Sequence, residues 1–433
     1  MPRIACLLVP DLPVAAACRA DPDLAARPLA LSEGGGPHAP IVAAAAAARA
    51  RGVRAGHTVA QARAIAADLV VRPRDEAAER SAVRALVDVA ASLASRIEAA
   101  ADGAVFLDAA GAAHLVPSEA GLATALVARA ARVGLAARAA VGGSMTVARL
   151  AALHGGEVVP AGTELGFLAP LPLACLAPPP EIAATLARWG IRRLGDLARL
   201  PVAEVATRLG PAGAVLVRTA RGEDERPLAP QALGGPLEEA VGLEHALDAL
   251  EPLLFVLRGL VERVVARVGL EGIGVARLGL ALGLDDRSRD ERAVPLAAPT
   301  RDVKTLLTCL RVELEARPPR AAVERVVLAA VPEAVRAAQL GLFSPAGPSP
   351  ERLATTLARL AALCGADRDR PDFVRGEGLG GRVVGAAGPW RVAGEWWSDG
   401  AFARDYFDLE LTDGGIYRCF RENGRWFVDG VYD

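Results

Sequence analysis

The sequence predicts an α+β protein built from several domains. Its 433 residues exceed what one hydrophobic core usually holds, and a hydrophobic content of 52% is enough for several cores. Short apolar runs alternate with segments of helical periodicity, which is typical of mixed α and β structure. The last part of the chain is rich in aromatic residues and turn signals, which predicts a separate β-rich module.

The charge balance excludes a strongly basic nucleic-acid-binding chain. The formal net charge is −2, so any contact with nucleic acid must come from local basic patches. Of the 49 basic residues, only Lys304 is a lysine.

The sequence pattern of residues 1–167 predicts a core that contains both strands and helices. Strands are expected over residues 3–9, 104–108 and 136–141. Helices are expected over residues 40–50, 58–67, 75–99 and 119–132.

Residues 168–238 begin with a proline-rich connector and continue as a small helical block. Two helices flank the turn Trp189-Gly190-Ile191, which is the pattern of a helix-hairpin-helix. A glycine in such a turn lets backbone N–H groups approach a phosphate. The DNA-binding residues predicted here are Gly190, Ile191, Arg192 and Arg193. The alternative is a plain helical linker.

Residues 239–336 predict a compact α+β module. Helices are expected over 251–268 and 300–316, and strands over 275–284, from 292 onward, and over 322–331. Basic and acidic residues are nearly balanced here, so the DNA-binding face predicted to include Lys304 would depend on where the basic residues lie.

Residues 337–350 form a linker that opens with the pentapeptide QLGLF, and residues 351–433 form a C-terminal region. The runs YFDLEL, IYRCF and RWFVDGVY are separated by the turn signals TDGG and ENG, which predicts an antiparallel meander. Its aromatic residues could contact a protein or stack on single-stranded bases, and the sequence does not decide between these.

No metal, cofactor or membrane span is expected. The cysteines are far apart, with no spacing typical of a zinc site, so free thiols are predicted. They are Cys6, Cys18, Cys175, Cys309, Cys364 and Cys419. No stretch reaches 18 clean apolar residues, the approximate length that a membrane span requires.

The order of these parts resembles the Y-family, or translesion, DNA polymerases. The resemblance implies palm and fingers over residues 1–167, a thumb over 168–238 and a little finger over 239–336. It is carried locally by AAAAAARARGVRAGHTVAQARAI (43–65), which looks like the family's fingers segment, and by PDLAARPLAL (22–31).

The resemblance also shows where a catalytic site should lie. Members of the family transfer a nucleotidyl group with two Mg²⁺ ions held by carboxylates from two strands. By the register of the first strand, two of the carboxylate positions here hold Pro10 and Leu12, and by the match of VFLD (105–108) the other two hold Gly103 and Ala104. Of the residues that contact the triphosphate in the family, only Arg49 is retained. The chain is therefore expected to lack catalytic residues and to be a pseudo-polymerase.

The competing interpretation is an active translesion polymerase with displaced carboxylates. Asp11, Asp102 and Asp108 lie near the expected site and would have to rebuild it. A shift of one residue turns a strand side chain to the opposite face, which argues against this rescue.

The pentapeptide Gln339, Leu340, Gly341, Leu342 and Phe343 resembles the motif by which bacterial proteins bind the sliding clamp. Together with the tail pattern GEWW…RDY…RWFVDG, it makes the chain resemble the ImuB-like, non-catalytic members of the Y family. That resemblance implies an adaptor in damage-induced mutagenesis in the cytoplasm, associated with the nucleoid when DNA is damaged. Its partners would be the clamp, an error-prone replicative-type polymerase, a RecA-like accessory protein and DNA. A DNA-structure-binding protein without a clamp link is a third interpretation.

Overall fold

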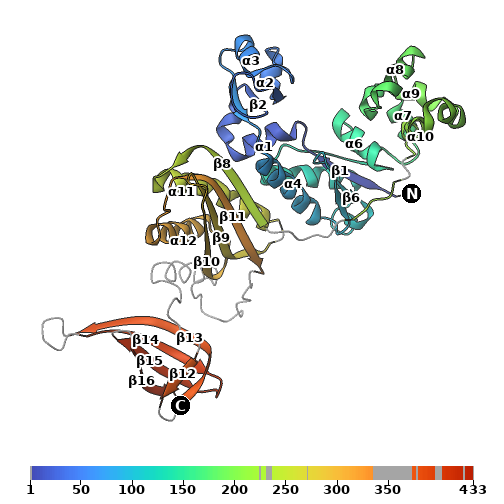
Figure 1. The fold of residues 1–433 in the computed structure, drawn as a ribbon. Coiled ribbons are helices and arrows are strands. Elements are labelled where there is room, and N and C mark those ends of the chain that lie inside the picture. Colours follow the sequence, from blue (N-terminus) through green and yellow to red (C-terminus); the bar gives the residue numbers. More distant parts are fainter. Residues whose placement is uncertain are drawn as a thin grey trace. The chain divides into compact units, whose positions relative to one another are not determined.

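The computed structural model describes residues 2–223, 226–230, 237–270, 272–334, 373–376, 379–394, 402–422 and 425–432. The chain divides into two compact units, residues 1–360 and 361–433 (Figure 1). Each unit contains sheets and the first also contains helices, so the α+β prediction is confirmed. Within the described residues, helices that are both long and apolar enough to cross a membrane are absent.

The palm-like part of the first unit is an antiparallel sheet of order β5-β6-β1-β7. All five residues of the central strand β1 are buried, because helices cover both faces of the sheet. Ala5 and Leu7 pack with α4 and α5, whereas Ile4, Cys6 and Leu8 pack with α6. The elements are β1 (Ile4–Leu8), β5 (Ile97–Ala99), β6 (Val105–Asp108), β7 (Arg138–Gly142), α4 (Glu76–Ala91), η2 (Ala110–Ala112), α5 (Glu119–Arg132) and α6 (Met145–His154).

The fingers-like part contains a small sheet of order β3-β2-β4, three short α-helices and one 3-10 helix. These are α1 (Leu12–Ala20), η1 (Pro22–Ala26), β2 (Leu29–Ser32), β3 (Ile41–Ala44), α2 (Ala46–Ala50), α3 (Val59–Ile65) and β4 (Val70–Pro73). The helix expected over 40–50 covers only Ala46–Ala50, because residues 41–44 pair with β2. The helix expected over 75–99 ends at Ala91, and its last residues form β5 instead.

The thumb-like part packs onto the second face of the palm-like sheet. Leu186, Leu194, Leu197 and Val217 are buried in the same core as Cys6. The helices are α7 (Glu164–Leu168), η3 (Leu173–Leu176), α8 (Pro180–Arg188), α9 (Leu194–Ala198) and α10 (Val202–Ala220), and α10 is interrupted at Gly210.

The little-finger-like part is an antiparallel sheet of order β10-β9-β11-β8 with two helices on one face (Figure 1). Leu278, Leu280 and Leu282 alternate along β9 and are buried on the helix side. The strands are β8 (Leu237–Leu247), β9 (Gly274–Leu284), β10 (Arg289–Thr300) and β11 (Val323–Glu333), and the helices are α11 (Leu250–Val268) and α12 (Val303–Ala316). Strand β8, which the sequence did not predict, crosses the expected boundary between residues 238 and 239.

The second unit is one five-stranded sheet in which consecutive strands pair antiparallel, as the predicted meander requires. The strands are β12 (Phe373–Gly376), β13 (Leu379–Gly394), β14 (Phe402–Leu411), β15 (Ile416–Glu422) and β16 (Arg425–Tyr432). Phe407, Leu409 and Cys419 form its core, and β12 and β13 extend the meander beyond the prediction.

A buried cluster of charges ties β8 of the little-finger-like sheet to the palm-like helices. We call it the Glu239 cluster, and it comprises Arg19, Ser81, Asp88, Glu239, Arg263 and Arg267. Arg19 donates two hydrogen bonds to Glu239, at 2.8 and 2.7 Å, and Arg267 donates one at 3.0 Å. The side chains of Arg19 and Glu239 are only 4% and 1% exposed, so this ion pair is shielded from water and salt.

The cluster keeps Glu239 ionised. Burial alone would raise the pKa of Glu239, but the hydrogen bonds and charges of Arg19, with Arg267 and Ser81, lower it to about 2. Its stabilising contribution is therefore complete above the ordinary value of 4.5 and is lost as the pH falls toward 2. Burial raises the pKa of Asp88, which opposes this dependence, so the effect of Glu239 must be isolated with a variant.

We expect Glu239→Gln to weaken the attachment of β8 to α4 by about 3–5 kcal/mol, because it leaves buried arginines without a counter-charge. The matched control is Glu119→Gln, which removes a carboxylate from Arg3 at a more exposed site and should cost about 1 kcal/mol or less. Hydrogen exchange of the β8 and α4 amides measures both. The wild type should also lose protection between about pH 4.5 and 2 more steeply than Glu239→Gln. Equal effects of the two substitutions would contradict this account of the cluster.

Candidate metal site and nucleic-acid interface

The four positions at which the family resemblance requires carboxylates lie together at one end of the palm-like sheet. Leu7 of β1 pairs with Val105 of β6 in antiparallel register. Pro10 and Leu12 follow β1, and Gly103 and Ala104 precede β6. Because the two strands are antiparallel, these two segments lie at the same end of the sheet. The elements thus meet as the resemblance implies, but none of these four side chains offers an oxygen ligand.

An apolar contact fills the space at this edge. A Cβ atom placed on Gly103 would lie 2.5 Å from Cδ2 of Leu12 and 3.3 Å from Cγ2 of Val83. Gly103 also has a φ of +84°, which residues with a side chain rarely adopt. Ala104 is buried in the core next to it. A longer side chain at position 103 would therefore have to displace Leu12.

The three neighbouring aspartates lie in separate ion pairs. Asp11 pairs with Arg49 at 2.8 Å, and Asp102 pairs with Arg149. Asp108 pairs with Arg96 at 3.2 Å and lies opposite Ile4, at the far end of β1 and β6 from Asp11. Among the described residues, no three histidine, cysteine or acidic side chains lie close enough to hold a metal ion. The described residues therefore offer no cluster of metal ligands of the kind that the displaced-carboxylate hypothesis requires.

Arg49 is the retained residue of the expected triphosphate site, and its guanidinium already has two acceptors. It donates to Asp11 at 2.8 Å and to the backbone carbonyl of Ala44 at 2.6 Å. Asp11 itself has a φ of 53°, an uncommon backbone conformation for a residue with a side chain. Both bonds use Nη1, so Asp11 partly neutralises the charge of Arg49 that a phosphate would meet.

The turn between α8 and α9 has the geometry of a phosphate-contacting loop. Gly190 has a φ of +77° with no atom within 4 Å of its missing side chain, so the backbone is open to a ligand. Arg192 and Arg193 are exposed, and their backbone N–H groups have no acceptor among the described residues. Ile191 is half-buried and donates its N–H to the carbonyl of Leu186, so its role is structural support of the turn.

Two exposed arginines, which the sequence analysis did not single out, lie on the open face of the little-finger-like sheet, together with Glu238 and Glu291. Arg277 of β9 and Arg325 of β11 are exposed and alternate with the buried leucines, so they lie on the face away from α11 and α12. Small residues such as Gly279 and Ala281 lie on the same face and leave it flat. The signal that could have found them is the period-two alternation of arginine with leucine in these strands.

Lys304 does not join this surface. It lies on α12, on the helix-covered side of the sheet. Its predicted contact with DNA stays a prediction. The pentapeptide Gln339–Phe343 lies outside the described residues.

We expect Gly103→Ala to cost about 1–3 kcal/mol more than Gly162→Ala. Gly162 has the same φ of +84°, but no atom lies within 4 Å of the place of its side chain. Alanine is therefore forced into a strained backbone conformation in both variants, and only in Gly103→Ala does its methyl group also clash with Leu12. Urea denaturation measures the difference. Combining Gly103→Ala with Leu12→Ala should recover about 1 kcal/mol in a double-mutant cycle. Equal losses in both glycine variants would show that Leu12 does not fill the site.

Comparison with known proteins supports the resemblance. The impB/mucB/samB family model matches residues 11–153. Protein ImuB of Caulobacter vibrioides is 28% identical over 88% of this chain and 100% of its own length. DNA polymerase IV of Halorhodospira halophila is 30% identical over 69% of this chain and 86% of its own length.

Among solved structures, DinB from Sulfolobus solfataricus matches 77% of this chain and 100% of its own, with 18% identity and a TM-score of 0.46. The family assignment rests on the sequence matches, since structural likeness at this score is too low to support it. The chain belongs to the impB/mucB/samB family, and it is an ImuB-like homologue of the Y-family DNA polymerases.

Proposed function

We propose that this protein is a non-catalytic adaptor in damage-induced translesion synthesis and mutagenesis, as part of the SOS response. The observation that carries the proposal is the packing of Leu12 against Gly103 at the edge where the family's metal ligands would converge. Nucleotidyl transfer of the two-metal type needs two cations about 3.5–4 Å apart, each neutralising developing charge on oxygen. Apolar side chains at that edge cannot gather them.

The ion pairs of the nearby aspartates also support a non-catalytic role. Asp11, Asp102 and Asp108 each have one carboxylate oxygen already paired with an arginine. Asp108 would in addition have to reach from the far end of the strand. The alternative function, an active translesion polymerase with displaced carboxylates, therefore requires a rearrangement of the palm-like sheet.

The adaptor holds DNA weakly and largely without regard to sequence. The open turn at Gly190, with Arg192 and Arg193, can contact backbone phosphates. Arg277 and Arg325 add two positive charges on a flat sheet face. Such contacts depend on phosphate neutralisation, so the affinity should fall steeply with salt concentration.

The adaptor binds the sliding clamp through the pentapeptide from Gln339 to Phe343. Burying Leu342 and Phe343 would supply roughly 1.5–3 kcal/mol each, from which the cost of ordering the segment is deducted. The result is a modest affinity that suits a contact made and released during synthesis. The Y-family resemblance, strengthened by the ImuB match, supports the motif's assignment.

Two further partners follow from the ImuB likeness: an error-prone replicative-type polymerase that performs the synthesis, and a RecA-like accessory protein. The C-terminal unit supports a role in protein contact, because Trp390, Trp426 and Phe427 are between 37% and 45% exposed. We place the protein in the cytoplasm, on the nucleoid after DNA damage. A DNA-structure-binding protein without a clamp link would be indifferent to the pentapeptide.

Pull-down of purified sliding clamp by the full chain tests the adaptor function. We expect Leu342→Ala/Phe343→Ala to weaken clamp binding at least about 30-fold, since both apolar anchors are removed. The matched control, Leu115→Ala/Leu165→Ala, removes two large apolar side chains from exposed positions and should bind like the wild type. Equal retention of the wild type and the pentapeptide variant would refute clamp binding by this motif.

A further inference from the structure

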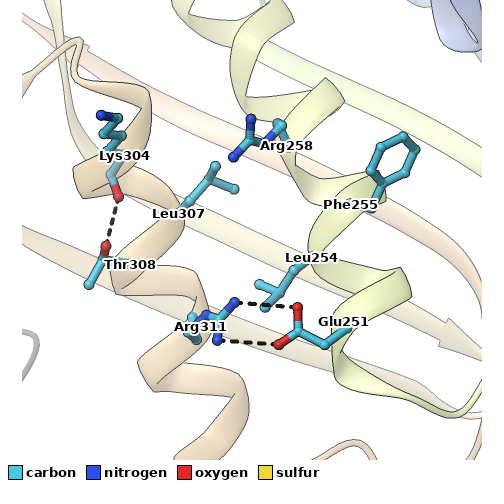
Figure 2. Close-up of a pocket in the computed structure, with 8 residues that line it drawn as sticks. All are labelled: Glu251, Leu254, Phe255, Arg258, Lys304, Leu307, Thr308 and Arg311. Atoms are coloured by element: carbon cyan, nitrogen blue, oxygen red, sulfur yellow. Dashed lines mark hydrogen bonds and ion pairs between the residues drawn. The ribbon is translucent and has the colours of Figure 1, made fainter.

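A groove runs between the two helices of the little-finger-like part, and it is not part of the surfaces described above. Its volume is about 670 Å³, and each helix lines it with residues at i, i+3, i+4 and i+7 spacing (Figure 2). The lining residues are Glu251, Leu254, Phe255 and Arg258 of α11 with Lys304, Leu307, Thr308 and Arg311 of α12.

The middle of the groove is apolar. Leu254 is buried and Leu307 is half-buried, and together they form its floor. Phe255 stands beside them and is 78% exposed, more than any other large apolar side chain that is exposed among the described residues. A phenyl ring left in water beside two leucines is typical of a binding surface rather than of a helix that faces only solvent.

The two ends of the groove carry charge. At one end Glu251 and Arg311 form an ion pair, with 3.3 Å between a carboxylate oxygen and a guanidinium nitrogen (Figure 2). At the other end Arg258 and Lys304 make no ion pair within the described residues. Three cations against one carboxylate make the groove positive, and the positive charge without a counter-ion lies next to the apolar floor.

We propose that this groove binds an acidic amphipathic helix of a partner protein. The apolar stripe of that helix covers Phe255, Leu254 and Leu307, and its carboxylates pair with Arg258 and Lys304. Nucleic acid fits less well, because the apolar floor and the exposed ring of Phe255 offer phosphates no partner.

The position of the groove on the fold allows two ligands at once. It lies on the helix layer, whereas Arg277 and Arg325 lie on the opposite face of the same sheet. The acidic helix can therefore stay bound while the sheet contacts DNA. This inference goes beyond the clamp motif and does not depend on it, because it rests on residues of α11 and α12 alone.

The test is fluorescence anisotropy on the full chain with three synthetic helices of about 16 residues, a length that can hold helical structure. All three carry the same leucine and phenylalanine stripe, flanked by glutamate, glutamine or lysine. We expect the glutamate peptide to bind with a Kd below about 1 mM and at least about 10-fold more tightly than the glutamine peptide. Phe255→Ala should weaken binding of the glutamate peptide at least about 5-fold.

Charge reversal supplies the decisive comparison. Arg258→Glu/Lys304→Glu should prefer the lysine peptide over the glutamate peptide, which simple misfolding would not produce. Arg84→Glu, an exposed substitution on α4, is the matched control and should leave the order of the peptides unchanged. Leu342→Ala/Phe343→Ala should also leave it unchanged, so failure of clamp binding and failure of this proposal can be told apart.

Three results would overturn the proposal. The first is the absence of saturable binding of the glutamate peptide below about 1 mM, or equal affinity for all three peptides. The second is loss of duplex-DNA binding in Arg258→Glu/Lys304→Glu as large as in Arg277→Glu/Arg325→Glu, which would assign the groove to nucleic acid. The third is self-association of the wild type that Phe255→Ala abolishes, which would assign it to a second copy of the chain.

Discussion

Two magnesium ions can be held close together only where several oxygen ligands converge, and this requirement decides what the polymerase-like scaffold can do. Here the strands that would supply the ligands are in place and in register, but Leu12 packs into the space above Gly103. This hydrophobic contact packs the end of the sheet, where closely spaced carboxylates would repel one another. An apolar contact thus lies where the family's carboxylates would converge, and this is the basis of the proposed non-catalytic role.

In the proposed adaptor, the other surfaces of the molecule serve as contacts for DNA and proteins. The Glu239 cluster fixes the little-finger-like sheet to the palm-like helices through buried charges rather than through apolar packing alone. The sheet's two faces then differ: arginines on a flat open side, and a positive groove with Phe255 on the helix side. A sheet with two different faces is suited to holding DNA on one side and a protein on the other.

The sequence predicted the long, strongly periodic elements and the degenerate metal positions, but not the short strands or the ion pairs. Residues 97–99 follow α4 without glycine or proline, so nothing local marks the end of that helix. β8 was missed because Glu239 breaks the apolar alternation, and only tertiary contact with Arg19 shows why a glutamate is buried there. The pairing of Asp11 with Arg49 likewise depends on how α1 and α2 meet, which no spacing reveals.

The most direct test of the account is template-directed primer extension by the full chain with Mg²⁺ and, separately, with Mn²⁺, which tolerates imperfect oxygen ligation. The account predicts no incorporation above that of a sample without the protein, and no change on Asp11→Ala. Incorporation that follows the template and disappears in Asp11→Ala would show that the displaced aspartates assemble a working site, and it would contradict the non-catalytic account.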